Sequence, residues 1–250
     1  MHGLAKFLRG STPTPRRRRE RRAAFGVDFT DEDVELIQSL KPFTMTDPMR
    51  VHAMIEAVRY VARYNLPGEI VECGVWRGGS MMAAAKILIS RGQQDYTLRL
   101  FDTFEGMSKP TKWDVTRRGT SAMEEFERKK LSDGSSEWCK VEVETVKQNM
   151  LSTGYDPDRI ILIKGKVEDT LPQHAPDKIA LLRLDTDFYE STRHELVHLY
   201  PLLVRGGIII VDDYGRWRGS QKATDEYLEQ TGTQLFLSRV DYTARIGVKL

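Results

Sequence analysis

The chain has 250 residues, of which 40% are hydrophobic and 30% charged, and its formal net charge is +2. This length is enough to bury a core, and the two cysteines cannot form the disulfide framework of a small secreted domain, so we expect a reducing, cytoplasmic location. No apolar stretch is long enough to span a bilayer, and the basic N-terminal run lacks the apolar region of a signal peptide, so we expect no membrane partner.

The charge is distributed unevenly. Residues 1–30 carry eight lysines or arginines and two acidic residues, a balance of +6, which leaves −4 for the rest of the chain. An arginine run at 16–22 follows the segment STPTP at 11–15, a composition typical of a flexible arm. We therefore predict a basic arm over 1–30 and a single domain over 31–250. No aromatic residue is interleaved with these arginines, so nucleic acid is not expected as the main partner.

Helical and strand signals follow one another along the rest of the chain. Thr30 suits the N-cap of a helix that ends near Leu40. Thr192 and Glu195 form a capping-box pattern for a late helix that ends before Pro201. Other helices are expected at about 48–64, 80–90, 123–131, 141–150 and 221–229. Strands are expected at about 70–73, 98–101, 160–163, 179–184, 208–211, 235–240 and 244–248.

Acidic residues follow two of the predicted strands, 179–184 and 208–211. Both strands are continuous apolar runs, which is typical of strands buried on both faces of a parallel sheet. Ligands bind outside the carboxyl ends of such strands, so the acidic residues should share one pocket. Their charges repel unless a cation or shared protons compensate, and a hard divalent metal with oxygen ligands is the simplest interpretation. Solvated acids in strand-end turns are the alternative. The four residues are Asp185, Asp187, Asp212 and Asp213.

The segment 72–80 (ECGVWRGGS) joins the first predicted strand to its helix. Its glycines permit positive φ and close approach of a ligand, and the helix N-terminus offers free N–H groups to an anion. Neither the G-x-G-x-x-G pattern nor a P-loop is present. Glu72 suits a cationic group, and Asp102, which follows strand 98–101, suits ribose hydroxyls. Together these features outline S-adenosylmethionine; a purely structural turn and a capping role for Asp102 are the alternatives.

Five motifs follow one another along the chain: ECGVWRGGS (72–80), FDTFEGM (101–107), EDTLP (168–172), LDTDFYEST (184–192) and VDDYG (211–215). In this order they resemble the macrocin O-methyltransferase family, whose members methylate sugar hydroxyls on macrolides and related natural products. The resemblance covers about residues 42–250, whereas the arm at 1–30 matches no pattern. It implies a Rossmann-like class I methyltransferase of the α/β class, with a seven-stranded, mostly parallel sheet, helices on both faces and an N-terminal helical extension. It also implies S-adenosylmethionine as donor and dependence on Mg²⁺.

The resemblance further implies roles for individual residues. Asp185, Asp212 and Asp213 would ligate the metal, and Asp187 would be the general base, which makes Asp185 and Asp187 the catalytic residues. Acceptor-facing segments would be 103–138 and 214–220. Donor binding is implied for Glu72, Gly74, Ser80 and Asp102, for Val167 and Glu168 near the adenine, and for Thr44 and Met45 in a loop that folds over the donor.

The predicted chemistry follows from the high pKa of an aliphatic hydroxyl. A divalent cation on that oxygen lowers its pKa, and Asp187, on the same side of an extended strand as Asp185, takes the proton. The leading hypothesis is therefore a Mg²⁺-dependent O-methyltransferase acting on a sugar hydroxyl of a secondary metabolite, with a small glycoside as substrate and a homo-oligomeric assembly. The alternatives are a catechol-type phenolic O-methyltransferase and a non-enzymatic nucleotide-binding or RNA-binding module. Candidates for the acceptor wall are Trp76, Tyr189, Tyr214 and Trp217.

Overall fold

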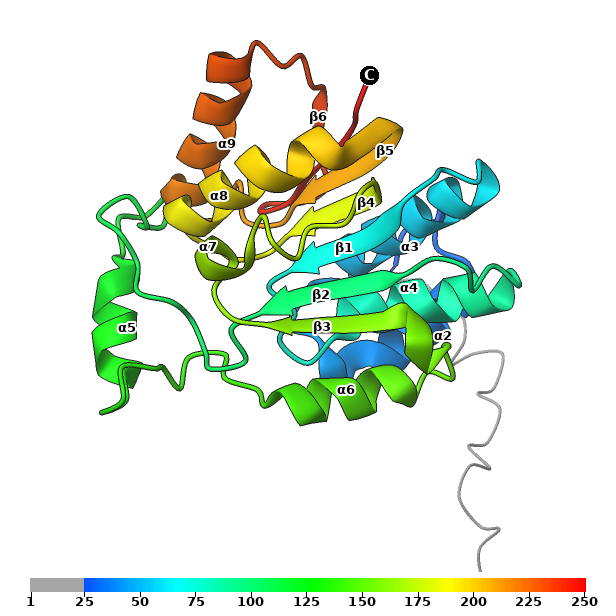
Figure 1. Cartoon of the computed structure of the whole chain (residues 1–250), viewed down its shortest axis with the longest axis horizontal. Helices are drawn as coiled ribbons and strands as arrows, with labels where there is room; N and C mark the ends of the chain where they lie inside the picture. Colours follow the sequence, from blue (N-terminus) through cyan, green and yellow to red (C-terminus); the bar gives the residue numbers. More distant parts are fainter. Residues whose placement is uncertain (1–24) are drawn as a thin grey trace, which may run out of the picture.

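The computed structural model describes residues 25–250, so all but the last six residues of the predicted arm lie outside the described part. The described chain forms one seven-stranded sheet in the order β3-β2-β1-β4-β5-β7-β6, with helices on both faces (Figure 1). All strand pairs are parallel except those that involve β7. The predicted seven-stranded, mostly parallel α/β sheet is confirmed.

The register of the central strands brings their carboxyl ends to one edge of the sheet. Cys73 pairs with both Phe101 and Leu184, and Leu184 pairs with Val211. Chain order reverses between β1 and β4, and such a reversal opens a crevice for ligands. The strands are β1 (Glu69–Cys73), β2 (Leu98–Asp102), β3 (Ile160–Lys164), β4 (Ile179–Leu184), β5 (Leu203–Val211), β6 (Leu237–Arg239) and β7 (Arg245–Val248).

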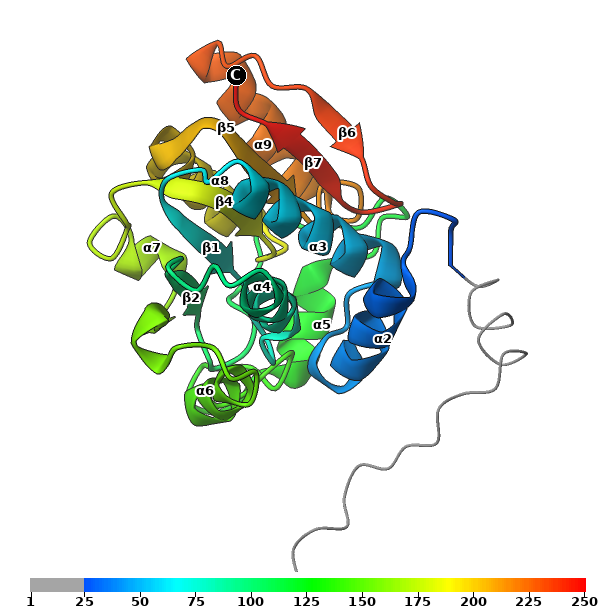
Figure 2. The same cartoon turned by 90° about the vertical axis from the view of Figure 1, so that its right-hand side faces the viewer.

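Two layers of helices sandwich the sheet (Figure 2). One apolar cluster joins α2, α3, α4 and α6 to one face, and a second joins α7, α8 and α9 to the other. The α-helices are α2 (Asp31–Leu40), α3 (Pro48–Arg63), α4 (Gly79–Ser90), α5 (Ala122–Lys129), α6 (Val143–Leu151), α7 (Val167–Thr170), α8 (Tyr189–Leu199) and α9 (Arg218–Thr231). Short 3₁₀ turns are η1 (Lys41–Phe43), η2 (Pro157–Arg159) and η3 (Tyr200–Leu202).

The start of α8 differs from the sequence prediction. The helix begins at Tyr189 and not after Thr192, and its N-cap, Phe188, makes no side-chain capping bond. Thr192 and Glu195 are buried inside the helix, so they do not form the predicted capping box. Asp114 supplies the helix cap instead, because its Oδ1 accepts a hydrogen bond from the N–H of Tyr189 at 2.7 Å. A cap from a residue 75 positions away leaves no local signal.

The predicted cap at Thr30 is present. The Thr30 hydroxyl accepts from the Asp33 N–H, and the Asp33 carboxylate accepts from the Thr30 N–H, which completes a capping box at the start of α2. None of the helices within residues 25–250 combines the length and apolar character needed to cross a membrane.

Candidate active site

A cavity of about 260 Å³ opens at the carboxyl ends of β1, β2, β4 and β5. Most residues that the sequence predicted for a site line this cavity. Its walls also include Phe43, Arg50, Trp138, Cys139 and Trp217, which come from distant segments of the chain. The predicted residues in the lining are Thr44, Met45, Gly74, Ser80, Asp102, Val167, Glu168, Asp185, Asp187, Asp212 and Asp213.

The glycine turn after β1 is shaped by the adjacent end of β4. Gly74 has φ +81°, and a Cβ atom added there would lie 2.0 Å from the backbone oxygen of Asp185. Gly78, with φ +86°, directly precedes α4. Positive φ at both positions is accessible to glycine at little cost. Glycine at 74 therefore lets the turn and the first acidic segment come into backbone contact.

Asp102 holds the other side of this turn. Its Oδ2 accepts hydrogen bonds from the N–H groups of Val75 at 2.7 Å and Trp76 at 3.0 Å. Its Oδ1 accepts from the Phe104 N–H at 2.8 Å. A carboxylate offers about four lone-pair sites, so these bonds leave limited capacity for ribose hydroxyls. The predicted ribose contact stays a prediction, and the visible role of Asp102 is to fix the turn.

Glu72 lies outside the residues that line the cavity. The residue is 1% exposed, and its Oε1 accepts a hydrogen bond from Nη1 of Arg183 at 2.5 Å. Burial, partly offset by Arg183, raises the pKa of Glu72 to about 7. Glu72 thus contacts the site through Arg183, and its predicted contact with a cationic donor group stays a prediction.

The acidic residues after β4 and β5 converge as predicted. Asp185, Asp212 and Asp213 each offer an oxygen, and these atoms all lie within 4.8 Å of one another. Sheet pairing continues past the strand ends and fixes two of them: the Asp185 N–H donates to the Cys73 carbonyl, and the Asp212 N–H donates to the Leu184 carbonyl.

Two arginines that the sequence analysis did not single out contact this cluster. Arg183 is 2% exposed in β4 and reaches Asp185 at 2.7 Å and Asp212 at 3.0 Å. Arg50, from α3, pairs with Asp212 and with Asp241, the latter at 3.1 Å. An arginine inside an apolar strand is a signal of a buried ion pair, because an unpaired buried charge is costly. Arg50 gives no such signal, because it lies on an amphipathic helix.

The arginines do not neutralise the site. Within residues 25–250, ion pairs join the two guanidinium groups to three of the five carboxylates in the cluster, and Arg50 is shared with Asp241. Burial and mutual repulsion raise the pKa of Asp185 and of Asp213 well above the usual range, and that of Asp187 to about 7. Burial also acts on Asp212, but Arg183 and Arg50 outweigh it and lower its pKa. The five carboxylates belong to Glu72, Asp185, Asp187, Asp212 and Asp213.

A hard divalent cation fits the donor set of this cluster. Among the described residues, Asp213 has no arginine partner, and its Oδ2 is buried without a hydrogen bond. Asp185 pairs with Arg183 through Oδ2 alone. Asp212 pairs with guanidinium groups through both oxygens, Oδ1 with Arg183 and Oδ2 with Arg50, so the oxygens without an arginine partner belong to Asp185 and Asp213. Carboxylate oxygens and the lack of a soft ligand in this cluster match the chemistry of Mg²⁺ or Ca²⁺ sites.

The segment 103–138 closes the cavity on one side and carries α5. Asp114, fully buried, accepts from Thr111 through Oδ2 and from Tyr189 through Oδ1, which ties this segment to α8. Trp138 and Trp217 line the cavity and contact each other edge to face. Of the four predicted acceptor-wall aromatics, Trp76 and Trp217 line the cavity; Tyr189 and Tyr214 lie outside its lining.

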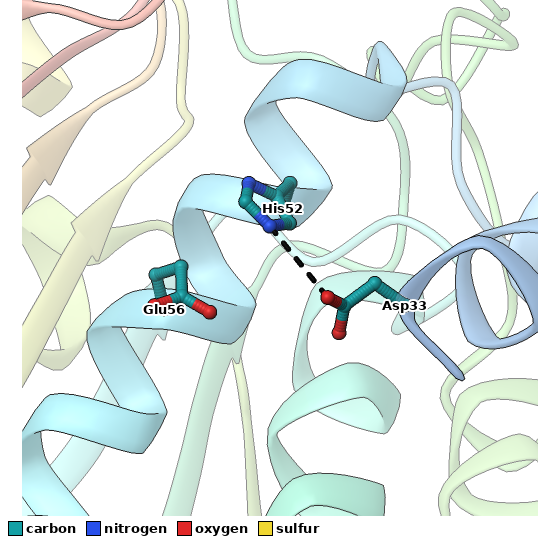
Figure 3. A group of neighbouring side chains, drawn as sticks. All are labelled: Asp33, His52 and Glu56. Atoms are coloured by element: carbon teal, nitrogen blue, oxygen red, sulfur yellow. Dashed lines mark ion pairs between the residues drawn. The ribbon is translucent and has the colours of Figure 1, made fainter. Parts of the chain in front are cut away.

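Asp33, His52 and Glu56 form a second group of possible ligands, between α2 and α3 (Figure 3). Arg59 pairs with Asp33 and with Glu56, each at 2.6 Å. The other Asp33 oxygen accepts two hydrogen bonds from Thr30, and His52 Nε2 lies 3.8 Å from it. Because these oxygens are already engaged, the group is an ion-pair and capping network that joins two helices.

The model of the family described as Macrocin-O-methyltransferase (TylF) matches residues 16–246. The match begins well before residue 42 and so includes part of the basic segment that the sequence analysis did not place.

Individual relatives agree with this match. The chain is 34% identical over 184 residues to a demethyldecarbamoylnovobiocin O-methyltransferase of Streptomyces niveus, which covers 74% of this chain and 67% of the relative. It is 29% identical over 198 residues to a mycinamicin III 3''-O-methyltransferase of Micromonospora griseorubida, which covers 79% of this chain and 75% of that relative.

Solved structures give the same result. The O-methyltransferase NovP superposes with a TM-score of 0.72 at 30% identity, covering 83% of this chain and 82% of NovP. The calicheamicin methyltransferase CalS11, at 20% identity and a TM-score of 0.62, shares the fold. The chain therefore belongs to the macrocin O-methyltransferase family and is an S-adenosylmethionine-dependent O-methyltransferase.

Proposed function

We propose that this protein transfers the methyl group of S-adenosylmethionine to a sugar hydroxyl of a glycosylated natural product, with Mg²⁺ held by Asp185, Asp212 and Asp213. One observation carries the proposal: the glycine turn and the acidic cluster border the same cavity, and Gly74 contacts the backbone of Asp185. Donor and acceptor sites in one cavity give the proximity that a direct transfer requires.

The donor is proposed to lie along the turn after β1 and the start of α4. Free N–H groups at the N-terminus of α4, near Ser80, suit the donor carboxylate. Asp102 would face the ribose, and Val167 with Glu168 would border the adenine. Thr44 and Met45 would cover the donor, consistent with the close packing of Thr44 on Gly79 and the exposed position of Met45 on the cavity wall.

The transfer breaks the methyl carbon–sulfur bond and forms a carbon–oxygen bond to the acceptor, releasing S-adenosylhomocysteine. When bound, the cation would lower the pKa of the acceptor hydroxyl. Asp187 is proposed to take the proton of that hydroxyl on a carboxylate oxygen. Arg183 pairs with Oδ2 of Asp185 and Oδ1 of Asp212, and Arg50 pairs with Oδ2 of Asp212, so the two arginines fix the orientation of both carboxylates.

The class of acceptor rests on the relatives. Two relatives are named for demethyldecarbamoylnovobiocin and mycinamicin III, and a third is named for a tetracenomycin that carries a dimethoxyrhamnosyl sugar. A catechol acceptor receives no comparable support, because the caffeoyl-CoA O-methyltransferase neighbour is 13% identical and shows the fold alone. Family membership also argues against the alternative that the chain is a non-enzymatic RNA-binding module.

Two assays test the proposal. Methyl transfer should be measured with demethyldecarbamoylnovobiocin, as a glycoside probe, and with a simple catechol, each with EDTA and then with added Mg²⁺. We expect transfer to the glycoside, lost in EDTA and restored by Mg²⁺. Preference for the catechol would overturn the acceptor class, and a full rate in EDTA would overturn the metal role.

A further inference from the structure

The indole of Trp217 contacts the proposed base directly. Its Nε1–H donates a hydrogen bond to Oδ1 of Asp187 at 2.6 Å. Asp187 has φ +67°, in the left-handed region that non-glycine residues rarely adopt. The backbone therefore places Asp187 at a fixed point after β4, and the indole fixes the direction of its carboxylate.

Trp217 is itself held from several sides. Its backbone N–H donates to the carbonyl of Asp213 at 3.0 Å, and it forms an isolated β-bridge with Thr116 in the segment 103–138. Its ring packs edge to face against Phe188 and Trp138, with ring centroids 5.7 Å and 6.3 Å away, respectively. With 5% of its surface exposed, the side chain has little room to change rotamer.

These contacts place Trp217 between the base, the acidic cluster and the acceptor-facing segment. A buried N–H that donates to a carboxylate makes a strong, charge-assisted bond and leaves the second carboxylate oxygen available. Small displacements of a catalytic group cost about a hundredfold in rate.

We propose that Trp217 is a positioning residue for Asp187: its indole N–H holds one carboxylate oxygen, so that the other accepts the proton of the acceptor hydroxyl. This inference rests on the proposed role of Asp187 as base. Because Trp217 is bridged to Thr116, the alignment of the base depends on the position of the segment that faces the acceptor.

Trp217→Phe keeps an aromatic ring and removes the donor. We expect kcat to fall by about ten- to a hundredfold, whereas the acceptor KM and the affinity for S-adenosylhomocysteine change less than about threefold. Replacement of Trp217 by 3-benzothienylalanine, which keeps the ring shape but carries sulfur in place of N–H, should reproduce the loss. Tyr64→Phe is the control for an exposed aromatic residue, since Tyr64 is 60% exposed and lies outside both the cavity lining and the segment 103–138.

A double-mutant cycle with Asp187→Asn separates the proposed role of Asp187 as base from the proposed positioning role of Trp217. Asn tolerates the left-handed backbone, so this variant keeps the local conformation. If Asp187→Asn retains the wild-type rate, the proposed base is wrong. If it is slow but Trp217→Phe and the benzothienylalanine variant both retain wild-type kcat, the positioning role is wrong and the base stands. An undiminished effect of Trp217→Phe in the Asp187→Asn background would also overturn the positioning role, because the indole would then act by another route.

Discussion

The backbone oxygen of Asp185 lies so close to Gly74 that a Cβ atom at position 74 would approach it to 2.0 Å. This contact joins the turn proposed to bind the donor to the first proposed metal ligand through backbone atoms alone. It also explains why one cavity borders both the glycine turn and the acidic cluster. β1 and β4 are neighbours in the sheet, and their last residues, Cys73 and Leu184, are paired.

Gly74→Ala should separate the two halves of the site. The left-handed conformation costs an L-residue about 1–2 kcal/mol, and the clash with Asp185 displaces the turn in addition. We expect the affinity for S-adenosylhomocysteine to fall more than about tenfold in calorimetric titration. Gly154→Ala is the control, because Gly154 has nearly the same φ, +79°, and no atom within 4 Å of an added Cβ. Equal effects of the two substitutions would show that the contact is unimportant.

Asp102→Ala should weaken donor binding. The substitution removes the acceptor for three backbone N–H groups of the turn and its surroundings, together with the proposed ribose contact. A loss of about tenfold or more in affinity for S-adenosylhomocysteine is expected, at about 1 kcal/mol for each hydrogen bond. Glu105→Ala alters an exposed carboxylate of the same segment and should leave the affinity unchanged. Unchanged affinity in Asp102→Ala would contradict both roles.

Asp114→Ala should weaken binding of the acceptor and leave binding of the donor unchanged. The buried carboxylate joins Thr111 to the first N–H of α8, so its loss leaves two half-buried backbone donors without this acceptor, at a cost of about 1 kcal/mol each. We expect the acceptor KM to rise severalfold with donor affinity retained. Asp133→Ala, an exposed acid that caps a turn in the same segment, serves as control. An unchanged acceptor KM would show that the segment does not depend on this anchor.

The stability of the protein should depend on pH through Asp33. Burial alone would raise the pKa of this carboxyl, but hydrogen bonds from Arg59 and Thr30 outweigh burial and lower it below its ordinary value of 3.8. Since the pKa is lower in the folded state, the contribution of Asp33 is present above about pH 4 and is lost as the pH falls through the folded value.

Urea unfolding of Asp33→Asn tests this linkage. At pH 7 the variant should be less stable than the wild type by about 1–2 kcal/mol, the size of a capping interaction and a hydrogen bond to a charged group. The difference should shrink below pH 4. A difference that is constant between pH 7 and pH 3 would mean that the Asp33 charge contributes nothing.

Local patterns in the sequence are sufficient to predict much of the fold. The apolar runs that end at Leu184 and Val211 and the acids that follow them were enough to place one end of the sheet, because parallel strands align their carboxyl ends. The Thr30 cap was visible for a similar reason: both partners of the capping box lie within one helical turn. Such features depend on residues close together in sequence.

Contacts between distant segments were not predictable in this way. Arg50 reaches Asp212 across 162 positions, and Asp114 caps α8 across 75. The Thr192 pattern was misleading because a capping box is also compatible with a helix interior when another residue supplies the cap. Trp217 was a candidate for the acceptor wall, but its bond to Asp187 follows from the fold and not from any spacing in the sequence.

The central claim is that three converging carboxylates hold a cation beside the donor turn, and Mn²⁺ titration followed by electron paramagnetic resonance tests it most directly. The substitution to compare is Asp213→Asn, because Asp213 has no arginine partner among residues 25–250 and its loss leaves no guanidinium unpaired. We predict one bound Mn²⁺ per wild-type chain, displaced by Mg²⁺, and binding at least about tenfold weaker in Asp213→Asn with donor affinity retained. Absence of Mn²⁺ binding in the wild type, or equal binding in the variant, would contradict the account.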